Sequence, residues 1–592
     1  MKFPPGLGRI ALGGLALFAS LSPVFAASEV SNFALLDQRG EVYELRRSHA
    51  QAVVLFFTAN GCPVARQSVA KLNTLREAYA SRGVDILLVN SSSGDDRASI
   101  TKEMRGLKTP FIPVLKDDTQ GVARHLGVNR TGEAVVISTK DWSVIYRGAV
   151  DDQVSEGAQK PAATEKYLIA ALDSFLAGQP IAVAKTTARG CVIAYDGGEG
   201  ADSAPVSYAQ HVAPILEKNC VSCHSPGNIG SWSMSGHRKV KSMSAMIEEV
   251  ILTRRMPPWD ADQNIGKFSN STALKTSDAQ TLLRWVHQGA PRGEGDDPLA
   301  QRVTAKPADW PMGQPDIILR LPKPEQIPAT GILDYRRIKV AAGNATAGWV
   351  GAYWVRPGNN KVVHHVIARA FNENNKKEKG PSGAIEMFIA WAPGATQGNF
   401  PANSGKPLPA NATFELEMHY TTNGSPQTDQ TEIGLYLLKE KPLLRYESIP
   451  IVDDTFEIRP GDPNSRAQAT FAFRRGATLH SVTPHMHLRG RSMKFELLTP
   501  DGRQETIASV PRYDFNWQLT YQLAQPKKIS AGSWALLSGS WDNSKRNPAN
   551  PDPTRTIHWG EQSFDEMFLG FYNVTWDEES KPALKPASAK TE

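Results

Sequence analysis

The pentapeptide Cys220-Val221-Ser222-Cys223-His224 carries the most specific chemical pattern in this chain. Two thiols separated by two residues and followed directly by an imidazole form the attachment pattern of a c-type haem. Each thiol can form a thioether with a vinyl group of the porphyrin, and His224 is then placed to ligate the iron. A reducible dithiol and half of a zinc site are the alternatives, but a zinc site needs further ligands and the chain has no second such cysteine pair. The pattern predicts a covalent haem.

Met256 is the predicted sixth ligand of that haem. It lies in the loop Arg255-Met256-Pro257, late in the segment that surrounds the haem motif, where cytochromes c supply their axial methionine. A thioether ligand raises the reduction potential of the iron. The competing candidates, for each of which core packing is the alternative, are Met234, Met243, Met246 and His237.

Five histidines in the C-terminal half occur in three short contexts, namely His364-His365, His419 and His485-Met486-His487. Residues two apart on a strand point to the same face, so His485 and His487 can bind one metal ion. Adjacent His364 and His365 can share an ion only at a bulge or at a strand end. This clustering favours metal binding over the surface or core role that a lone histidine usually has in a β-protein.

Together with the stretch Trp559-Gly560-Glu561-Gln562-Ser563-Phe564-Asp565-Glu566-Met567, these histidines give residues 316–576 a resemblance to a known family. The region resembles the copper type II, ascorbate-dependent monooxygenases, which include the peptidylglycine α-hydroxylating and dopamine β-monooxygenases. The resemblance implies two copper ions. His364, His365 and His419 would hold an electron-transfer copper, and a distant second copper, where O2 meets the substrate, would have the ligands His485, His487 and Met567. Imidazoles suit both oxidation states of copper, and a thioether favours Cu(I).

Two features depart from the animal enzymes. All four cysteines lie at or before Cys223, so the β-domains lack the disulfides of those enzymes. Thr483 occupies the position at which the peptide hydroxylase has an arginine for the peptide carboxylate, so a peptidylglycine substrate is not predicted. His480 and His558 receive no role from the resemblance.

Residues 28–180 are predicted to form one α/β domain. Continuous apolar runs at 52–58, 84–90 and 133–137 are typical of buried parallel strands. Cys62-Pro63 follows the first run and precedes a helical pattern, which places the thiol at a helix N-terminus, where its pKa is lowered. The region resembles the thioredoxin-like redoxin family over most of its length.

The thiol chemistry of that family is incomplete here. Ala65 occupies the position of the second cysteine of the dithiol motif, and Gly132 occupies that of the usual cis-proline. Peroxiredoxins have proline and threonine where this chain has Leu55 and Ala59. Cys191 could pair with Cys62 as a structural or redox disulfide, because an oxidising compartment permits it. A working thiol site and a docking or structural role both remain open for this domain.

The length of 592 residues requires several domains, and the predicted fold is α/β, then all-α, then all-β. Lys2 and Arg9 precede an apolar run, which predicts a secretory signal and a periplasmic or secreted protein. A net charge of +6 without a basic run gives no indication of nucleic acid binding, and no later stretch is apolar enough for a membrane span. The predicted segments are a signal peptide (1–26), a thioredoxin-like domain (28–180), a linker (181–204), a small helical cytochrome c domain (205–291), a linker (292–315), two tandem antiparallel β-sandwiches (316–445 and 446–576) and a tail (577–592).

These observations predict an exported copper monooxygenase that uses O2 to hydroxylate a C–H bond of a small organic substrate. Its electrons would pass through the attached haem from an ascorbate-like reductant or a redox protein. The alternatives are a copper-binding or electron-transfer protein without hydroxylase activity and a thiol peroxidase or reductase.

Overall fold

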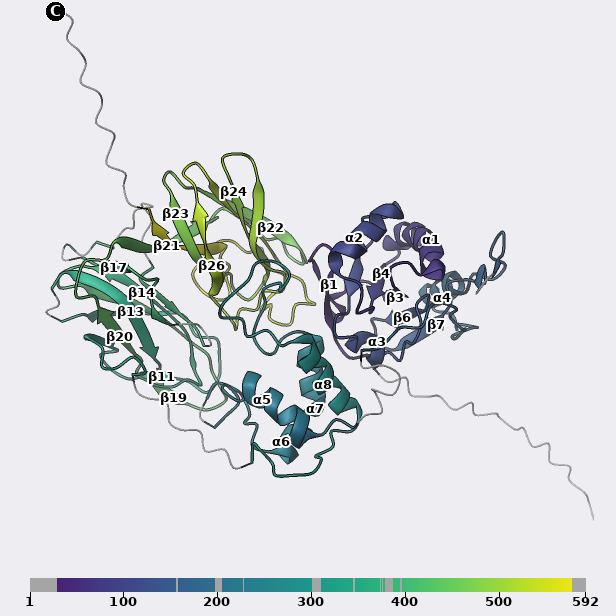
Figure 1. The fold of residues 1–592 in the computed structure, drawn as a ribbon, viewed down its shortest axis with the longest axis horizontal. Helices are drawn as coiled ribbons and strands as arrows, with labels where there is room; N and C mark the ends of the chain where they lie inside the picture. Colours follow the sequence, from purple (N-terminus) through teal and green to yellow (C-terminus); the bar gives the residue numbers. More distant parts are fainter. Residues whose placement is uncertain are drawn as a thin grey trace, which may run out of the picture.

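The computed structural model describes residues 29–577, except 156–157, 197–204, 227, 301–309, 344–345, 373, 375, 378–386 and 394–396. The predicted signal peptide and all but the first residue of the predicted tail lie outside this range. Within it, no helix is both long and apolar enough to cross a membrane. An α/β region, a helical region and a large β-rich region follow one another along the chain (Figure 1).

The α/β region is built on a seven-stranded sheet of order β2-β1-β5-β4-β3-β6-β7. Strand β3, in the interior of this sheet, pairs in parallel with β4 and antiparallel with β6. Val54 and Phe56 of β3 enter one core, while Val53 and Phe57 enter the other, so the predicted apolar run is a strand covered on both faces. The elements are β1 (Ala34–Asp37), β2 (Val42–Glu44), β3 (Ala52–Thr58), α1 (Pro63–Ala80), β4 (Val84–Asn90), α2 (Arg97–Gly106), β5 (Val114–Lys116), α3 (Gly121–His125), β6 (Ala134–Ser138), β7 (Val144–Gly148), β8 (Val154–Ser155), β9 (Ala158–Gln159) and α4 (Tyr167–Leu176).

Part of the predicted linker 181–204 is packed on this domain. We call residues 185–196 the strap. Lys185 and Val192 form β-bridges with Arg147 and Arg130, and Ile193 is buried in the core of the α/β domain. The strap, which lies within the predicted linker, is held on the domain by Ile193 and by these two β-bridges.

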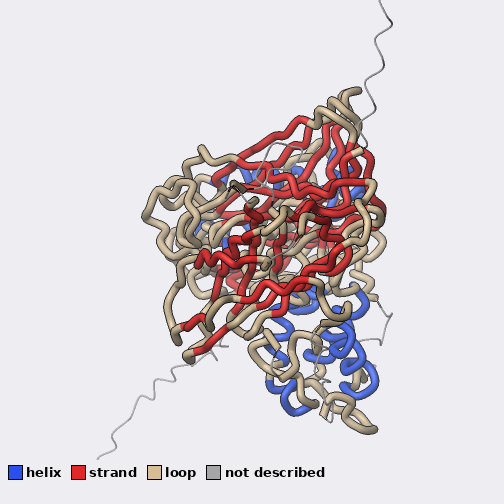
Figure 2. The backbone as a smooth tube through the Cα atoms, turned by 90° about the vertical axis from the view of Figure 1, so that its left-hand side faces the viewer, coloured by secondary structure: helices blue, strands red, loops and turns tan. Residues whose placement is uncertain are grey.

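The helical region consists of α5 (Ala213–Asn219), α6 (His237–Ser242), α7 (Ser244–Leu252) and α8 (Thr276–His287). These helices lie together below the strands (Figure 1 and Figure 2). Leu216, Leu282 and Trp285 lie in their shared core. Leu299 belongs to the same core, and Asp297 accepts hydrogen bonds from the His237 backbone and the Tyr208 hydroxyl. The helical domain therefore continues beyond the predicted boundary at residue 291.

A loop of the helical region is inserted into the C-terminal β-region. Trp259 and Ala261 lie in the core of that region. Asp262 N–H donates to Ser509 O at 2.8 Å, and Phe268 forms a β-bridge with Leu523. These contacts dock the haem-motif domain directly on the β-region.

The β-region contains a nine-stranded sheet of order β10-β20-β13-β17-β21-β28-β23-β26, with β16 paired to β13. Two four-stranded sheets, β12-β18-β14-β15 and β22-β27-β24-β25, complete two separate cores. The strands are β10 (Ile317–Arg320), β11 (Glu325–Ile327), β12 (Arg336–Ala341), β13 (Gly348–Arg356), β14 (Val363–Phe371), β15 (Ile389–Trp391), β16 (Gly398–Asn399), β17 (Ser404–Leu408), β18 (Thr413–Tyr420), β19 (Gln427–Asp429), β20 (Glu432–Leu437), β21 (Leu444–Val452), β22 (Ser465–Ala472), β23 (Ala477–His485), β24 (Gly490–Leu498), β25 (Gln504–Val510), β26 (Tyr521–Ile529), β27 (Trp534–Trp541) and β28 (Leu569–Trp576).

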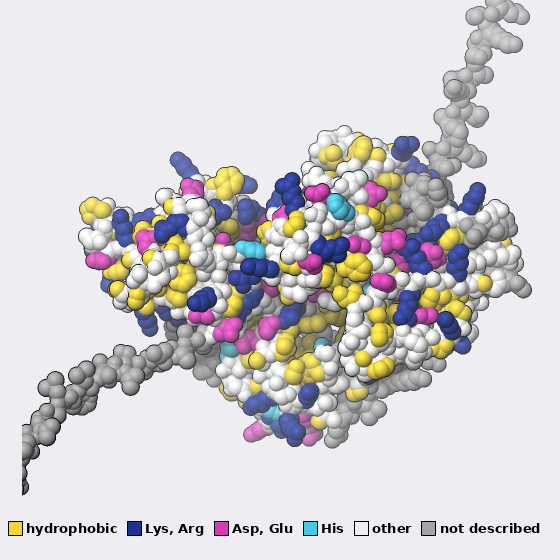
Figure 3. Space-filling view, turned by 180° about the vertical axis from the view of Figure 1, so that it is seen from behind, with side chains coloured by type: hydrophobic (Ala, Val, Ile, Leu, Met, Phe, Trp, Pro, Cys, Tyr) yellow, Lys and Arg dark blue, Asp and Glu magenta, His cyan; other side chains and the backbone are white. Residues whose placement is uncertain are grey.

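The two predicted β-sandwiches thus share one sheet. Strand β17 pairs in parallel with β21 through Ser404–Leu444 and Gly405–Arg445. Strand β21 then runs across the predicted boundary between residues 445 and 446 and pairs with β28. On the face drawn in Figure 3, basic and acidic side chains are interspersed over the surface.

Candidate metal centre

His364, His365 and His419 lie together on two paired strands of the first core. His365 is the register partner of His419, and the pairing of β14 with β18 shifts between Val363 and His365. This irregularity is the predicted bulge, and it lets both adjacent histidines face one point. Ligand nitrogens of the three histidines all lie within 4.8 Å of one another.

These three imidazoles are buried and partly unpartnered. His364 Nδ1 lies 3.2 Å from Nδ1 of His365 and 3.2 Å from Nδ1 of His419. The Nε2 atoms of His364 and His365 are buried without a hydrogen-bond partner, an arrangement that costs roughly 1–3 kcal/mol for each such group. Burial lowers the pKa of His364 to about 4, and burial together with the neighbouring histidines lowers that of His419 to about 2. Three neutral imidazoles whose ligand nitrogens converge on one point fit a copper ion.

His485 and His487 form the second set, at the C-terminal end of β23. Their ring centroids are 5.3 Å apart, and both side chains are buried. The His487 ring lies between Asp565 O, 3.4 Å from Nδ1, and the Tyr335 hydroxyl, 3.4 Å from Nε2.

Gln518 joins the two sets of histidines. Its Nε2 donates to His365 Nδ1 at 3.2 Å, and its Oε1 lies 2.7 Å from His485 Nδ1. Because the amide oxygen accepts, His485 donates from Nδ1 and keeps Nε2 as its ligand atom. The five histidines therefore form one contiguous cluster in this structure, instead of two distant sites.

The loop 559–567, which belongs to the predicted family resemblance, packs against the histidine cluster. Ser563 Oγ lies 3.3 Å from His419 Nε2. The buried Glu566 carboxylate accepts the backbone N–H groups of His487 and Arg489 and the indole N–H of Trp541. The loop thus contacts both sets of histidines, which explains why it accompanies them in the sequence.

Met567 is the last residue of this loop, and its side chain packs away from the loop's contacts with the histidines. It packs in a small apolar cluster with Met387, Leu569 and Phe571. Met387 and Phe571 line the same small cavity as His365 and His485. A role as copper ligand stays a prediction for Met567.

Two aromatic residues of the site carried no signal in the sequence. The Tyr335 ring lies 4.6 Å from that of His419, and its backbone N–H donates to Gln562 Oε1. Phe515 stacks on His364 with centroids 5.0 Å apart. Burial raises the pKa of Tyr335 well above its usual range, so its phenol stays protonated.

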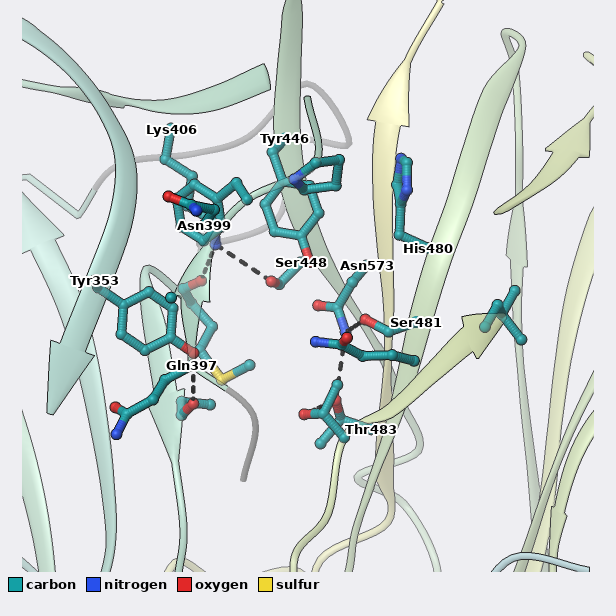
Figure 4. A pocket seen from close by; sticks show the side chains of 18 of the residues that line it. Tyr353, Gln397, Asn399, Lys406, Tyr446, Ser448, His480, Ser481, Thr483 and Asn573 are labelled. Atoms are coloured by element: carbon teal, nitrogen blue, oxygen red, sulfur yellow. Dashed lines mark hydrogen bonds between the residues drawn. The ribbon is translucent and has the colours of Figure 1, made fainter. Parts of the chain in front are cut away.

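A cavity of about 570 Å³ lies beside the centre, between the two cores (Figure 4). It shares Met387, Ala390, Thr483 and Thr520 with the smaller cavity that reaches His365 and His485. Lys406, which is 1% exposed, lies on its wall and donates to Met387 O at 2.6 Å and to Ser448 Oγ at 3.2 Å. His480 lines this cavity with Tyr446 and Asn573, whereas His558 is exposed.

The haem motif begins where α5 ends. Cys220 and Cys223 are free thiols, and burial raises the pKa of Cys220 to about 12. His224 Nδ1 lies 3.0 Å from Trp232 O, so a proton on Nδ1 would leave Nε2 available for iron. These residues fit the covalent attachment of a haem.

Met256 lies elsewhere. It lines a cavity of about 260 Å³ with Leu36 and Arg97 of the α/β domain and Trp259. Met234 is nearer to the motif, since its backbone N–H donates to His224 O at 2.8 Å. Among the described contacts none joins Met256 to His224, and the sixth ligand stays a prediction.

Cys62 caps the N-terminus of α1, as predicted, and its Sγ lies 3.1 Å from Cys191 Sγ. The strap supplies Cys191. Ala65 is buried in α1, and Gly132 adopts a positive φ of 77°.

Residues 26–150 match the family model described as AhpC/TSA family. The chain is 26% identical to the thiol-disulfide oxidoreductase ResA of Halalkalibacterium halodurans over 140 residues, which are 24% of this chain and 78% of that protein. Among solved structures, a hypothetical protein from Sinorhizobium meliloti 1021 is 24% identical, with 29% of this chain and 95% of that chain covered and a TM-score of 0.27. An uncharacterized conserved protein from Geobacillus kaustophilus is 28% identical, with 29% and 93% covered and a TM-score of 0.27. The N-terminal region is a thioredoxin-like redoxin domain, as predicted.

Proposed function

We propose that this protein is a copper-dependent monooxygenase that hydroxylates a C–H bond of an organic substrate. The observation that carries the proposal is the cluster of five buried histidines, two of which have unpartnered Nε2 atoms. His364, His365 and His419 would hold one copper, and His485 and His487, with Met567 nearby, would hold the second. Copper bound there would supply the one-electron chemistry that O2 activation requires.

The cavity beside the centre is the proposed substrate site. Its volume of about 570 Å³ suits a small organic molecule. Lys406 supplies a buried positive charge, and Tyr446 and Asn573 supply polar groups on the same wall (Figure 4). A substrate with an anionic group would place that group at Lys406, and the rest of the molecule would extend toward Thr483 and His485.

The docked helical domain supports a supply of electrons from within the chain. Trp259 and Ala261 are buried in the second β core, so a haem on Cys220 and Cys223 would belong to a domain packed against the one that carries the histidines. A reduced haem or an ascorbate-like reductant would then serve the copper centre.

Copper content and O2 uptake, measured together, test the proposal. The copper-loaded parent should bind two copper ions per chain and consume O2 only with reductant and a suitable substrate from a panel of organic anions. His364→Ala and His485→Ala should each lower copper towards one per chain and abolish substrate-dependent uptake. His558→Ala, which alters an exposed histidine, should resemble the parent.

The alternative is a copper carrier or electron-transfer protein. It would bind copper through the same histidines but would show no substrate-dependent O2 uptake with any member of the panel. Unchanged copper content in both histidine variants would reject the metal centre itself.

A further inference from the structure

A second reactive group lies outside the histidine cluster, where two cysteines 129 residues apart in the sequence meet. Cys62 immediately precedes α1 as its N-cap residue, and Cys191 lies in the strap that follows the thioredoxin-like domain. Within α1, the position that would complete a dithiol motif is Ala65. The strap therefore delivers the second sulfur from outside the motif.

The backbone of the strap is fixed independently of the sulfurs. Thr131 N–H donates to Cys191 O at 2.9 Å, and Cys191 N–H donates to Thr131 Oγ1 at 2.9 Å. Gly190 allows this close approach, since a Cβ there would lie 1.9 Å from Thr131 O. The two sulfurs, 3.1 Å apart, need to approach by only about 1 Å to reach the disulfide length of roughly 2.05 Å.

The two thiols are chemically unequal. Cys62 is 3% exposed, whereas Cys191 is exposed to solvent. Burial would raise the pKa of Cys62, but hydrogen bonds from the Thr131 hydroxyl, 3.0 Å away, and from backbone groups at the helix start outweigh it and lower that pKa. The hydrogen bond with Cys62 and burial raise the pKa of Cys191. Cys191 is thus the accessible sulfur, and Cys62 is the better leaving group.

We propose that Cys62 and Cys191 form a redox-active disulfide that exchanges electrons with external thiols through Cys191. An external thiolate attacks Cys191 Sγ, the bond to Cys62 breaks, and Cys62 leaves as a thiolate. A second external thiolate attacks the external sulfur of this mixed disulfide, releases Cys191 and completes the external disulfide. Two thiols lose two electrons in total, the protein disulfide gains them, and both cysteines take protons from solvent. The proposal is independent of copper.

Equilibration of the full-length protein in glutathione buffers of varied ratio tests this proposal. After an acid quench, peptide mapping by mass spectrometry should find a Cys62–Cys191 disulfide whose fraction changes with the ratio of reduced to oxidised glutathione. A complete absence of this cross-link would overturn the proposal. A cross-link that persists in excess dithiothreitol would mark a structural disulfide and would equally overturn it.

Two variants test the role of Cys191 as the attacked sulfur. Cys62→Ser should accumulate glutathione on Cys191, and Cys191→Ser should react with glutathione disulfide at Cys62 at least about tenfold more slowly, because Cys62 is buried. Equal rates, or the opposite order, would reject entry through Cys191. In the parent, faster reduction by a thioredoxin-type dithiol protein than by glutathione at equal thiol concentration would identify a protein as the source of electrons. Faster reduction by glutathione would identify a small thiol.

Discussion

The imidazoles of His365 and His485 lie 6.2 Å apart, centroid to centroid, although they belong to different β cores. Gln518 fills the space between them and contacts both rings. Any metal ions held by the two sets of histidines would therefore be linked through one amide. The two sets of histidines are therefore not separated by a wide layer of solvent in this structure.

Replacement of Gln518 should test this link. Gln518→Leu keeps all five imidazoles but removes the group that orients two of them, so copper affinity should fall by about 10- to 100-fold, as for other ligand-orienting groups. Isothermal titration with Cu(II) measures the effect. Gln504→Leu, on the exposed part of β25, is the matched control and should bind copper like the parent. An unchanged affinity in Gln518→Leu would show that the bridge does not position the ligands.

Met567→Ile should remove a soft thioether while leaving every histidine. If Met567 is a ligand, the second Cu(I) ion should bind more weakly, and O2 uptake should fall by at least about tenfold, while reduction of the haem is retained. Met493→Ile, a buried methionine of the second β core, controls for packing effects. Copper content and activity equal to the parent would remove Met567 from the proposed ligand set.

The haem motif predicts resistance to extraction. Because thioethers are covalent, haem should remain on the protein through acid-acetone treatment after expression with a haem-attachment system. Cys220→Ala combined with Cys223→Ala should release it or contain none. Haem that the parent loses to acid-acetone would contradict the prediction from the sequence.

Lys406 should matter for an anionic substrate more than for copper. Lys406→Met keeps the length of the side chain but removes the positive charge, so KM for such a substrate should rise by about tenfold or more, while copper content stays at the parental value. Lys528→Met, on an exposed stretch of β26, is the control. A KM that does not change would place the substrate elsewhere.

Glu248, which lies where the helical domain meets the thioredoxin-like domain, should make the free energy of unfolding depend on pH. Burial would raise its pKa, but hydrogen bonds with His125 and His287 outweigh it and lower the pKa to about 2. A carboxyl whose folded pKa is lowered stabilises the fold above its unfolded pKa of roughly 4.3, and the contribution is lost as the pH falls towards 2. Glu248→Gln should therefore be less stable than the parent at pH 6, by at most about 1 kcal/mol. Denaturant unfolding of both proteins should give converging stabilities near pH 2, and a constant difference would refute the assignment.

The sequence predicted elements where one local pattern decides the structure. The apolar run at 52–58 is β3, and the pair His364-His365 does occupy an irregular strand. Site residues that only tertiary packing brings to the histidines could not be predicted from the sequence. Gln518 and Tyr335 are single polar residues without a motif, and only the packing of the β-region places them against histidines. The strap lies within the predicted linker 181–204, because its single core residue Ile193 gives no periodic apolar pattern that would predict a packed segment.

Strand β21 joins the two parts of the C-terminal β-region, because it pairs with β17 on one side and with β28 on the other. A cut between residues 445 and 446 would sever β21, the strand that continues the shared sheet from β17 to β28, and each fragment would then end in a sheet edge, which invites association with other chains. The histidines of the centre would be divided between those fragments as well. We expect neither fragment to fold as an independent domain. Domain shuffling during evolution should therefore transfer residues 316–576 as one unit.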